Sequence, residues 1–328
     1  MTNRKIVVAG ASAGGVRALQ ELAAQLGPDF PAPVLAVQHI GSHTSILPSL
    51  LVRKARMPAS HAAEGEEPRA GHVHLAPPDH HMTLKDGRIR LTRGPKENHA
   101  RPAIDPLFRS AAAEYGPRVI GVLLTGLLDD GTAGLQAIKA GGGMAVVQHP
   151  SDAQAPSMPA SAMRFVDVDH AVPLNEMGAL LRQLVASVEE RAHPGFDTGF
   201  AHEIDLTLNE GDPMTHLKAI GRPSTFVCPD CDGALWEIAG SRPPRFRCHT
   251  GHGYTLRTLQ HAQSDATDEA LWSAFRALQE KEMLLRALSD AGGSPEVGEG
   301  AWLREAEEVA RHARELRRLL ERVPPPPE

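Results

Sequence analysis

The sequence lacks the features that mark membrane proteins and disulfide-rich secreted proteins. No stretch approaches the roughly 20 apolar residues of a membrane span, and the N-terminus runs into its first apolar segment too abruptly for a signal peptide. Only three cysteines occur, all between residues 228 and 248. This clustering disfavours a disulfide framework and favours metal binding in a reducing compartment. We therefore expect a cytoplasmic protein without membrane insertion.

Strong charge of one sign is also missing. The chain carries 34 basic and 40 acidic residues, a formal net charge of −6, so it has no global electrostatic attraction to nucleic acid or to a membrane surface. Aromatic residues make up only 4% of the sequence, and no basic, aromatic-rich patch surrounds the cysteines. We expect no nucleic-acid partner. A length of 328 residues allows about two domains.

Short β-branched runs alternate with helical patterns over residues 1–191. This alternation predicts an α/β fold, with a doubly wound, mostly parallel sheet and helices on both faces. Within it, Lys85-Asp86-Gly87 is typical of a hairpin turn. The expected strands are Ile6 to Ala9, Val34 to Gln38, Val73 to Ala76, Val119 to Leu124, Met144 to Gln148 and Val166 to Val168.

Beyond residue 191 the organisation changes. Residues 192–224 contain polar, Pro/Gly-containing sequence and are expected to form a linker, followed by a small cysteine module over 225–262. The sequence pattern predicts a helical hairpin over residues 265–323, with a break at Gly292-Gly293-Ser294-Pro295. It predicts a disordered tail over residues 324–328. The second helix carries an apolar seam that suits packing within the hairpin, which we favour, or contact with a partner helix or a second copy. The seam consists of Leu303, Ala306, Ala310, Ala313, Leu316 and Leu320.

The turn Gly10-Ala11-Ser12-Ala13-Gly14 between the first strand and the next helix is the first candidate site. It fits the G-x-S-x-G elbow, in which a serine nucleophile lies beside helix N-terminal amides that stabilise negative charge. A purely structural turn is the alternative. The dinucleotide fingerprint fails, because Ser12 replaces its second glycine and no acidic residue follows the second strand. No lysine follows the glycines, which excludes a P-loop and further disfavours a nucleotide-dependent enzyme.

Histidine and aspartate follow later strands of the same predicted sheet. His39 ends the second strand, and Asp129 and Asp130 follow Val119 to Leu124. Because catalytic groups gather at the carboxyl ends of parallel strands, a hydroxyl, an imidazole and a carboxylate are expected at one edge. The pattern alone leaves His149 as a rival to His39 and does not separate Asp129 from Asp130.

Further stretches carry a specific pattern in a fixed order: Gly10 to Gly15, Val37 to His39, Gly71 to His81, Arg101 to Phe108, Leu123 to Gly126 with Asp130-Gly131, and Met158-Pro159. Through them, residues 4 to about 190 resemble the catalytic domain of the chemotaxis-type protein-glutamate methylesterases (CheB-type). The resemblance implies Ser12 as nucleophile, His39 as general base, Asp130 as its partner, and no catalytic cofactor. It also implies hydrolysis of γ-glutamyl methyl esters on chemoreceptors or another signalling protein, and some members also deamidate receptor glutamines.

Several features depart from the family pattern. Ala13 stands where members often carry threonine, Leu128 where a glycine is common, and Asp129 adds a carboxylate beside the expected catalytic one. The usual receiver domain does not precede the sheet pattern, so we expect no control by phosphorylation in cis. A non-catalytic signalling adaptor that retains the fold is the alternative function.

The cysteines form the second candidate site. Cys228-Pro229-Asp230-Cys231 is a C-x-x-C knuckle, and Cys248 lies one short hairpin later. Three thiolates and one imidazole are typical of a closed, structural zinc site. His252 is the preferred fourth ligand and His249 the rival. We expect this module and the C-terminal helices to serve in partner docking.

Overall fold

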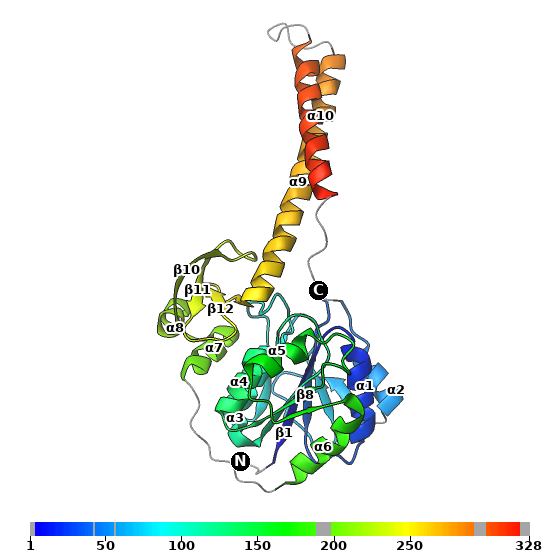
Figure 1. Cartoon of the computed structure of the whole chain (residues 1–328), viewed down its shortest axis with the longest axis vertical. Coiled ribbons are helices and arrows are strands. Elements are labelled where there is room, and N and C mark those ends of the chain that lie inside the picture. Colours follow the sequence, from blue (N-terminus) through cyan, green and yellow to red (C-terminus); the bar gives the residue numbers. More distant parts are fainter. Residues whose placement is uncertain (1–3, 42, 56, 188–197, 292–299, 322–328) are drawn as a thin grey trace. The chain divides into compact units, whose positions relative to one another are not determined.

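The computed structural model describes residues 4–41, 43–55, 57–187, 198–291 and 300–321. The chain divides into two compact units, Met1–Leu259 and Gln260–Glu328. The first unit contains the parallel sheet and also the cysteine module, and the second contains most of the C-terminal helices, which are labelled in Figure 1. None of the described helices is long and apolar enough to cross a membrane.

A seven-stranded parallel sheet organises the first unit, in the order β3-β4-β2-β1-β7-β8-β9. The order runs outward from β1 in both directions, as in a doubly wound fold. Strands β1, β2, β7 and β8 are buried along their whole length, which explains their nearly continuous apolar sequences. The strands are β1 (Ile6–Ala11), β2 (Val34–Gln38), β3 (Ala59–His61), β4 (Val73–Leu75), β7 (Val119–Leu123), β8 (Met144–Gln148) and β9 (His170–Val172).

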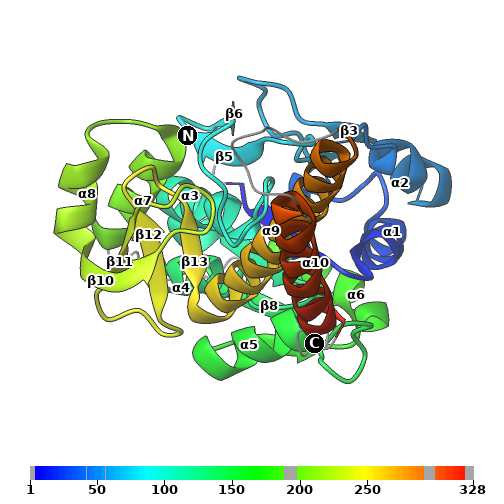
Figure 2. The same ribbon diagram turned by 90° about the horizontal axis from the view of Figure 1, so that it is seen from above.

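Helices cover both faces of this sheet. One face packs against α1 (Gly15–Leu26), α2 (Leu47–Ala55) and α6 (Leu174–Ala186). The other packs against α3 (Ile104–Tyr115), which continues into a 3-10 turn (Gly116–Arg118), and against α4 (Thr132–Ala140) and α5 (Ser157–Phe165). Figure 2 shows α1 and α2 on the side away from α3 and α4.

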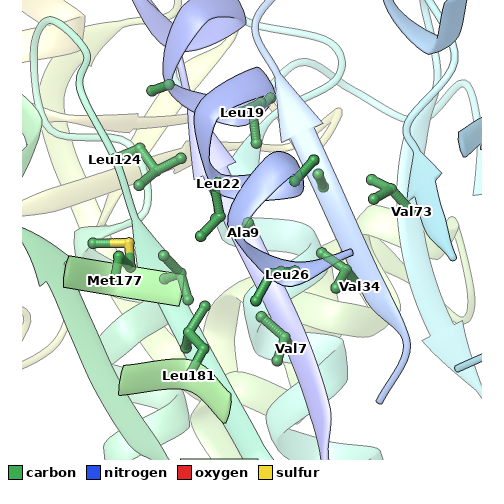
Figure 3. Close-up of a cluster of buried hydrophobic side chains, with 14 of the residues drawn as sticks. Val7, Ala9, Leu19, Leu22, Leu26, Val34, Val73, Leu124, Met177 and Leu181 are labelled. Atoms are coloured by element: carbon green, nitrogen blue, oxygen red, sulfur yellow. The ribbon is translucent and has the colours of Figure 1, made fainter. Parts of the chain in front are cut away.

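Alternate residues of β1 enter the two layers. Val7 and Ala9 face the α1 side, where Leu22 of α1 and Leu181 of α6 contact the same buried cluster (Figure 3). Ile6 and Val8 belong to the opposite cluster. This two-sided packing fixes the carboxyl end of β1, where Ser12 begins the turn into α1.

The hairpin expected around Asp86-Gly87 is confirmed as β5 (His81–Lys85) and β6 (Arg88–Thr92). Both turn residues have positive φ, 54° and 71°, as a two-residue hairpin loop requires. The strand expected at Val166 to Val168 is wrong. These valines pack against a core cluster from an irregular segment, and the strand forms at β9 instead.

Residues 198–227 differ from the expected linker. They form α7 (Thr198–Leu208), α8 (Pro213–Ile220) and the strand β10 (Gly221–Val227). The Asp212 side chain caps α8 by accepting from the amide of Thr215 at 2.9 Å. Short helices are stabilised here by tertiary contact, because Leu206, Leu217, Ile220 and Ile238 form one buried cluster. Residues 192–197 lie outside the described ranges.

The cysteine module is a four-stranded antiparallel sheet in the order β10-β11-β12-β13. Its further strands are β11 (Ala234–Ile238), β12 (Arg245–Cys248) and β13 (Gly253–Thr255). Cys228 follows β10 and Cys248 ends β12, so the cysteines converge at one end of the sheet. 

Two helices follow, α9 (Leu256–Asp290) and α10 (Ala301–Leu320). Leu278 and Leu285 of α9 contact Trp302, Ala306 and Val309 of α10 in a buried cluster, as the hairpin interpretation expected. Part of the predicted seam is buried, namely Ala306, Ala310 and Ala313, whereas Leu303 is exposed. The predicted break at 292–295 and the tail at 324–328 lie outside the described residues.

Candidate active site

Ser12 lies in the turn between β1 and α1, and its backbone is held on both sides. Its amide donates to the carbonyl of Thr125 at 3.0 Å, and its carbonyl accepts from the amide of Gly15 at 2.8 Å. Gly14 closes the turn with a φ of 77°, a left-handed conformation that favours glycine. Gly126 packs closely, since a Cβ there would lie 2.9 Å from Cβ of Ser12. The serine hydroxyl is therefore presented from a rigid turn.

His39 connects Ser12 to Asp130. Nδ1 of His39 lies 3.2 Å from Oγ of Ser12, and Nε2 lies 2.7 Å from Oδ2 of Asp130. The contact with the carboxylate assigns the ring proton to Nε2, which leaves Nδ1 to accept the serine proton. The His39 side chain is 20% exposed and the Asp130 side chain only 2%. The imidazole thus has access to substrate, while its carboxylate partner lies in the interior.

Asp130 is held by N–H donors as well as by His39. Its Oδ2 accepts from the amide of Ile104 at 2.7 Å, and its Oδ1 from Nδ2 of Asn98 at 2.8 Å and from the amides of Asp105 and Gly131 at 3.2 and 2.9 Å. Burial opposes the charged form, but the hydrogen bond and charge of His39 and these donors together lower the pKa of Asp130. Asp130 is therefore an anion at neutral pH.

Two neighbours of Asp130 were assigned no role from the sequence. Asp105 accepts from the amides of Gly131 and Gly134 at 3.0 and 2.7 Å, and from Nδ2 of Asn98 at 3.0 Å. Burial, followed by the charge of Asp130, raises the pKa of Asp105 to about 8. Asp105 lies in a stretch that resembles the family, which was an available signal. Asn98 had none, because its contacts involve residues far along the chain.

The rival candidates lie elsewhere. Asp129 points to a different partner and accepts from Oγ1 of Thr255 at 2.7 Å. Burial raises the pKa of Asp129 to about 6. His149 bonds to Oγ of Ser151 at 2.8 Å. Of the residues that the sequence left open, the structure thus places His39 and Asp130 in contact, next to Ser12.

Leu128, at the position where the family commonly has glycine, adopts a φ of 61°. This left-handed conformation is unfavourable for a residue with a branched side chain by roughly 1–2 kcal/mol. The turn geometry is therefore kept without the glycine, and the strain is located two residues before Asp130.

The predicted metal ligands converge. The ligand atoms of Cys228, Cys231, Cys248 and His252 all lie within 4.8 Å of one another. Sγ of Cys231 is 3.6 Å from Sγ of Cys248, and Nδ1 of His252 is 3.7 and 3.4 Å from Sγ of Cys228 and Cys248. A tetrahedral zinc ion with Zn–S bonds of about 2.3 Å separates its ligand atoms by roughly 3.5–3.8 Å. Three of the six separations between ligand atoms thus lie close to those of a tetrahedral zinc site.

His249, the rival fourth ligand, packs its ring over Gly233, where a Cβ would overlap the ring. A second group, not predicted from the sequence, consists of His202, Asp205 and His216. There Nδ1 of His202 and Nδ1 of His216 lie 2.9 Å apart, at hydrogen-bond distance. The sequence did not indicate this group because its residues lie in helices within the segment expected to be a linker.

The sheet domain is similar to known proteins. A family model described as CheB methylesterase matches residues 7–181. A protein-glutamate methylesterase/protein-glutamine glutaminase of Anaeromyxobacter dehalogenans is 41% identical over 181 residues, 55% of this chain. The match spans only 53% of that relative's own length. A relative from Leptospira interrogans is 37% identical over 184 residues, 56% of this chain and 95% of the relative.

A solved structure is also similar. The crystal structure of the Thermotoga maritima CheB methylesterase catalytic domain superposes with a TM-score of 0.53 at 33% identity. The superposition covers 56% of this chain and 99% of the Thermotoga chain. The similarity thus includes the parallel-sheet domain, whereas the family match ends at residue 181, before the cysteine module.

Proposed function

This chain belongs to the CheB methylesterase family, and on that premise we propose that it is a serine hydrolase. Its substrate is a γ-glutamyl methyl ester on a chemoreceptor-like or other signalling protein in the cytoplasm, and the products are glutamate and methanol. Deamidation of a protein glutamine is a second reaction of the same site. The chain of contacts from Ser12 through His39 to Asp130, at 3.2 and 2.7 Å, is the observation that carries the proposal.

In the first half of the reaction, Oγ of Ser12 attacks the ester carbonyl carbon while Nδ1 of His39 takes the hydroxyl proton. The Asp130 anion stabilises the resulting imidazolium through Nε2. The oxygen that becomes negative lies near the N-terminal end of α1, whose dipole favours negative charge. Collapse of the tetrahedral intermediate breaks the C–O bond to the methoxy group, which leaves as methanol with the proton from His39.

In the second half, water attacks the glutamyl-serine ester and gives its proton to His39. Breakage of the bond to Oγ then releases glutamate, and the proton returns to Ser12. With a glutamine side chain, the same sequence of steps releases ammonia in place of methanol. Neither reaction needs a cofactor.

Methanol release from a methylated receptor fragment tests the proposal. Ser12→Ala is expected to lower kcat by on the order of 10⁴ or more, as for other triad serines. Ser151→Ala is the matched control, because this serine is exposed and bonds a different histidine, His149. A wild-type protein that releases no methanol would favour the adaptor alternative, and a Ser12→Ala protein that retains more than a tenth of the wild-type rate would refute the role of Ser12 as nucleophile.

We also propose that the three cysteines and His252 hold a structural zinc ion. Support comes from ligand distances that match tetrahedral coordination. Zinc would then fix the ends of β10 and β12 in a sheet with few apolar residues of its own. The helices α9 and α10 are proposed to serve in docking a partner protein.

A further inference from the structure

Strand β13 of the cysteine module pairs with the segment that precedes α3. The amide of Gly253 donates to the carbonyl of Lys96 at 3.1 Å, and the amide of Asn98 donates to the carbonyl of Gly253 at 2.7 Å. On the module's side both bonds are made by Gly253, which directly follows the proposed ligand His252. The position of residues 96–98 thus depends directly on the module.

The side chain of Asn98 connects the module to the active site. Its Nδ2 donates to Oδ1 of Asp130 at 2.8 Å, and its Oδ1 accepts from the amide of Thr255 at 3.3 Å and from Oγ1 of Thr258 at 3.2 Å. These donors fix the orientation of the amide, because a flipped amide would place its oxygen against the Asp130 anion. Thr255 and Thr258 lie outside the part of the chain that matches the family.

A buried ion-pair network holds the same segment. Arg247, which directly precedes Cys248, lies 2.7 Å from Glu97 and 2.9 Å from Glu203. Arg109 of α3 contacts the same Glu97 carboxylate at 2.6 Å. Each of these four side chains is at most 3% exposed. Buried charges require close pairing, so a displacement of β12 would disturb Glu97, the neighbour of Asn98.

We propose that the cysteine module is a working part of the active site, in which Asn98 is a positioning residue that makes esterase activity depend on the bound metal. The proposal rests on the esterase and zinc functions proposed above. Loss of zinc frees Cys248 and His252, which flank the contacts made by Arg247 and Gly253. The bonds from Thr255 and Thr258 to Asn98 are then weakened, and the Asp130 carboxylate loses a fixed donor.

The first experiment leaves the metal ligands intact. Thr258→Val removes the hydroxyl that donates to Oδ1 of Asn98 without changing side-chain size, and we expect three- to tenfold lower kcat with KM within twofold of wild type. Asn98→Ala loses a bond to a charged group, and we expect about 100-fold lower kcat. Thr267→Val is the control, because Thr267 is exposed on α9 and its hydroxyl donates to the carbonyl of Gln263 in the same helix.

A purely structural role would leave the pH profile unchanged. Loss of the Asn98 donor destabilises the Asp130 anion, so the acidic limb of the pH–kcat profile should move to higher pH in Asn98→Ala and stay in place in Thr267→Val. Zinc content and circular dichroism check each variant. If Asn98→Ala does not fold, Thr258→Val and the metal experiment described next test the proposal.

The second experiment removes the metal from the full-length wild-type protein with a chelator. We expect kcat to fall at least tenfold, to recover on addition of zinc, and the amide of Asn98 to exchange hydrogen faster in the zinc-free protein. A zinc-free protein with wild-type kcat, or a Thr258→Val variant within twofold of wild type, would overturn the inference alone. A zinc-loaded wild-type protein without Ser12-dependent methanol release would overturn the esterase and this inference with it.

Discussion

The carboxyl group of Asp129 gives a quantitative prediction of how stability depends on pH. Its side chain is 1% exposed, and burial raises its pKa from 3.8 to about 6. The folded protein therefore binds a proton more tightly than the unfolded chain, and the contribution of this group to stability decreases as pH rises from about 4 to 6. A shift of about two pKa units corresponds to about 3 kcal/mol, of which about 2 kcal/mol falls between pH 4.5 and 7.5.

Asp129→Asn removes this titration and keeps the oxygen that accepts from Thr255. The free energy of unfolding of variant and wild type can be measured with urea at pH 4.5 and 7.5. The variant-minus-wild-type difference should be about 2 kcal/mol more positive at pH 7.5 than at pH 4.5. Asp167→Asn is the control at an exposed position and should show no such difference between the two pH values. If the variant-minus-wild-type difference is the same at both pH values within about 0.5 kcal/mol, burial does not raise the pKa of Asp129 and the reasoning is refuted.

Two further predictions concern the turn before Asp130 and the metal. Leu128→Gly should raise the free energy of unfolding by about 1 kcal/mol in urea denaturation, because glycine relieves the left-handed strain. The control is Leu127→Gly at the exposed neighbouring position, which should not raise the free energy of unfolding. An equal gain in both variants would exclude strain as the cause. Metal analysis should find one tightly bound zinc per wild-type chain and a loss of zinc in Cys248→Ser, with zinc retained in His249→Ala; purified wild-type protein without zinc would contradict the assignment.

The strands that the sequence predicted well are the ones buried on both faces. Val34–Gln38 and Met144–Gln148 form as expected, because a continuous β-branched run signals a central parallel strand. The edge strand β3, with the sequence Ala-Ser-His, carries no such signal and was not predicted. The segment Val166 to Val168 has the right residue types, but its side chains are used for packing against a neighbouring cluster. Tertiary contact therefore overrides local propensity at the edges.

The active-site residues divide in the same way. Ser12, His39 and Asp130 follow strands, so topology predicted that a serine, a histidine and an aspartate would meet at one edge. The family resemblance, and not topology, favoured His39 over His149 and Asp130 over Asp129. Asn98 could not be predicted in this manner, because its role depends on Thr255 and Thr258, more than 150 residues later. The helices α7 and α8 were likewise not predicted. Each is too short to give a clear periodic pattern of apolar residues in the sequence, and each is stabilised by tertiary contacts.

The buried charges explain why the module cannot be treated as a separate appendage. Within the described residues, Glu97 and Glu203 are almost fully buried, and they pair with Arg109 from the sheet domain and with Arg245 and Arg247 from β12. Burial opposes the charge of Glu203, but Arg245, Arg109 and Arg247 outweigh it and lower its pKa to about 2. Without β12, Arg109 alone would face both carboxylates, and uncompensated buried charge is strongly unfavourable. The module therefore stabilises the region around Asn98 electrostatically, which is the physical basis for expecting activity to follow the state of the cysteine site.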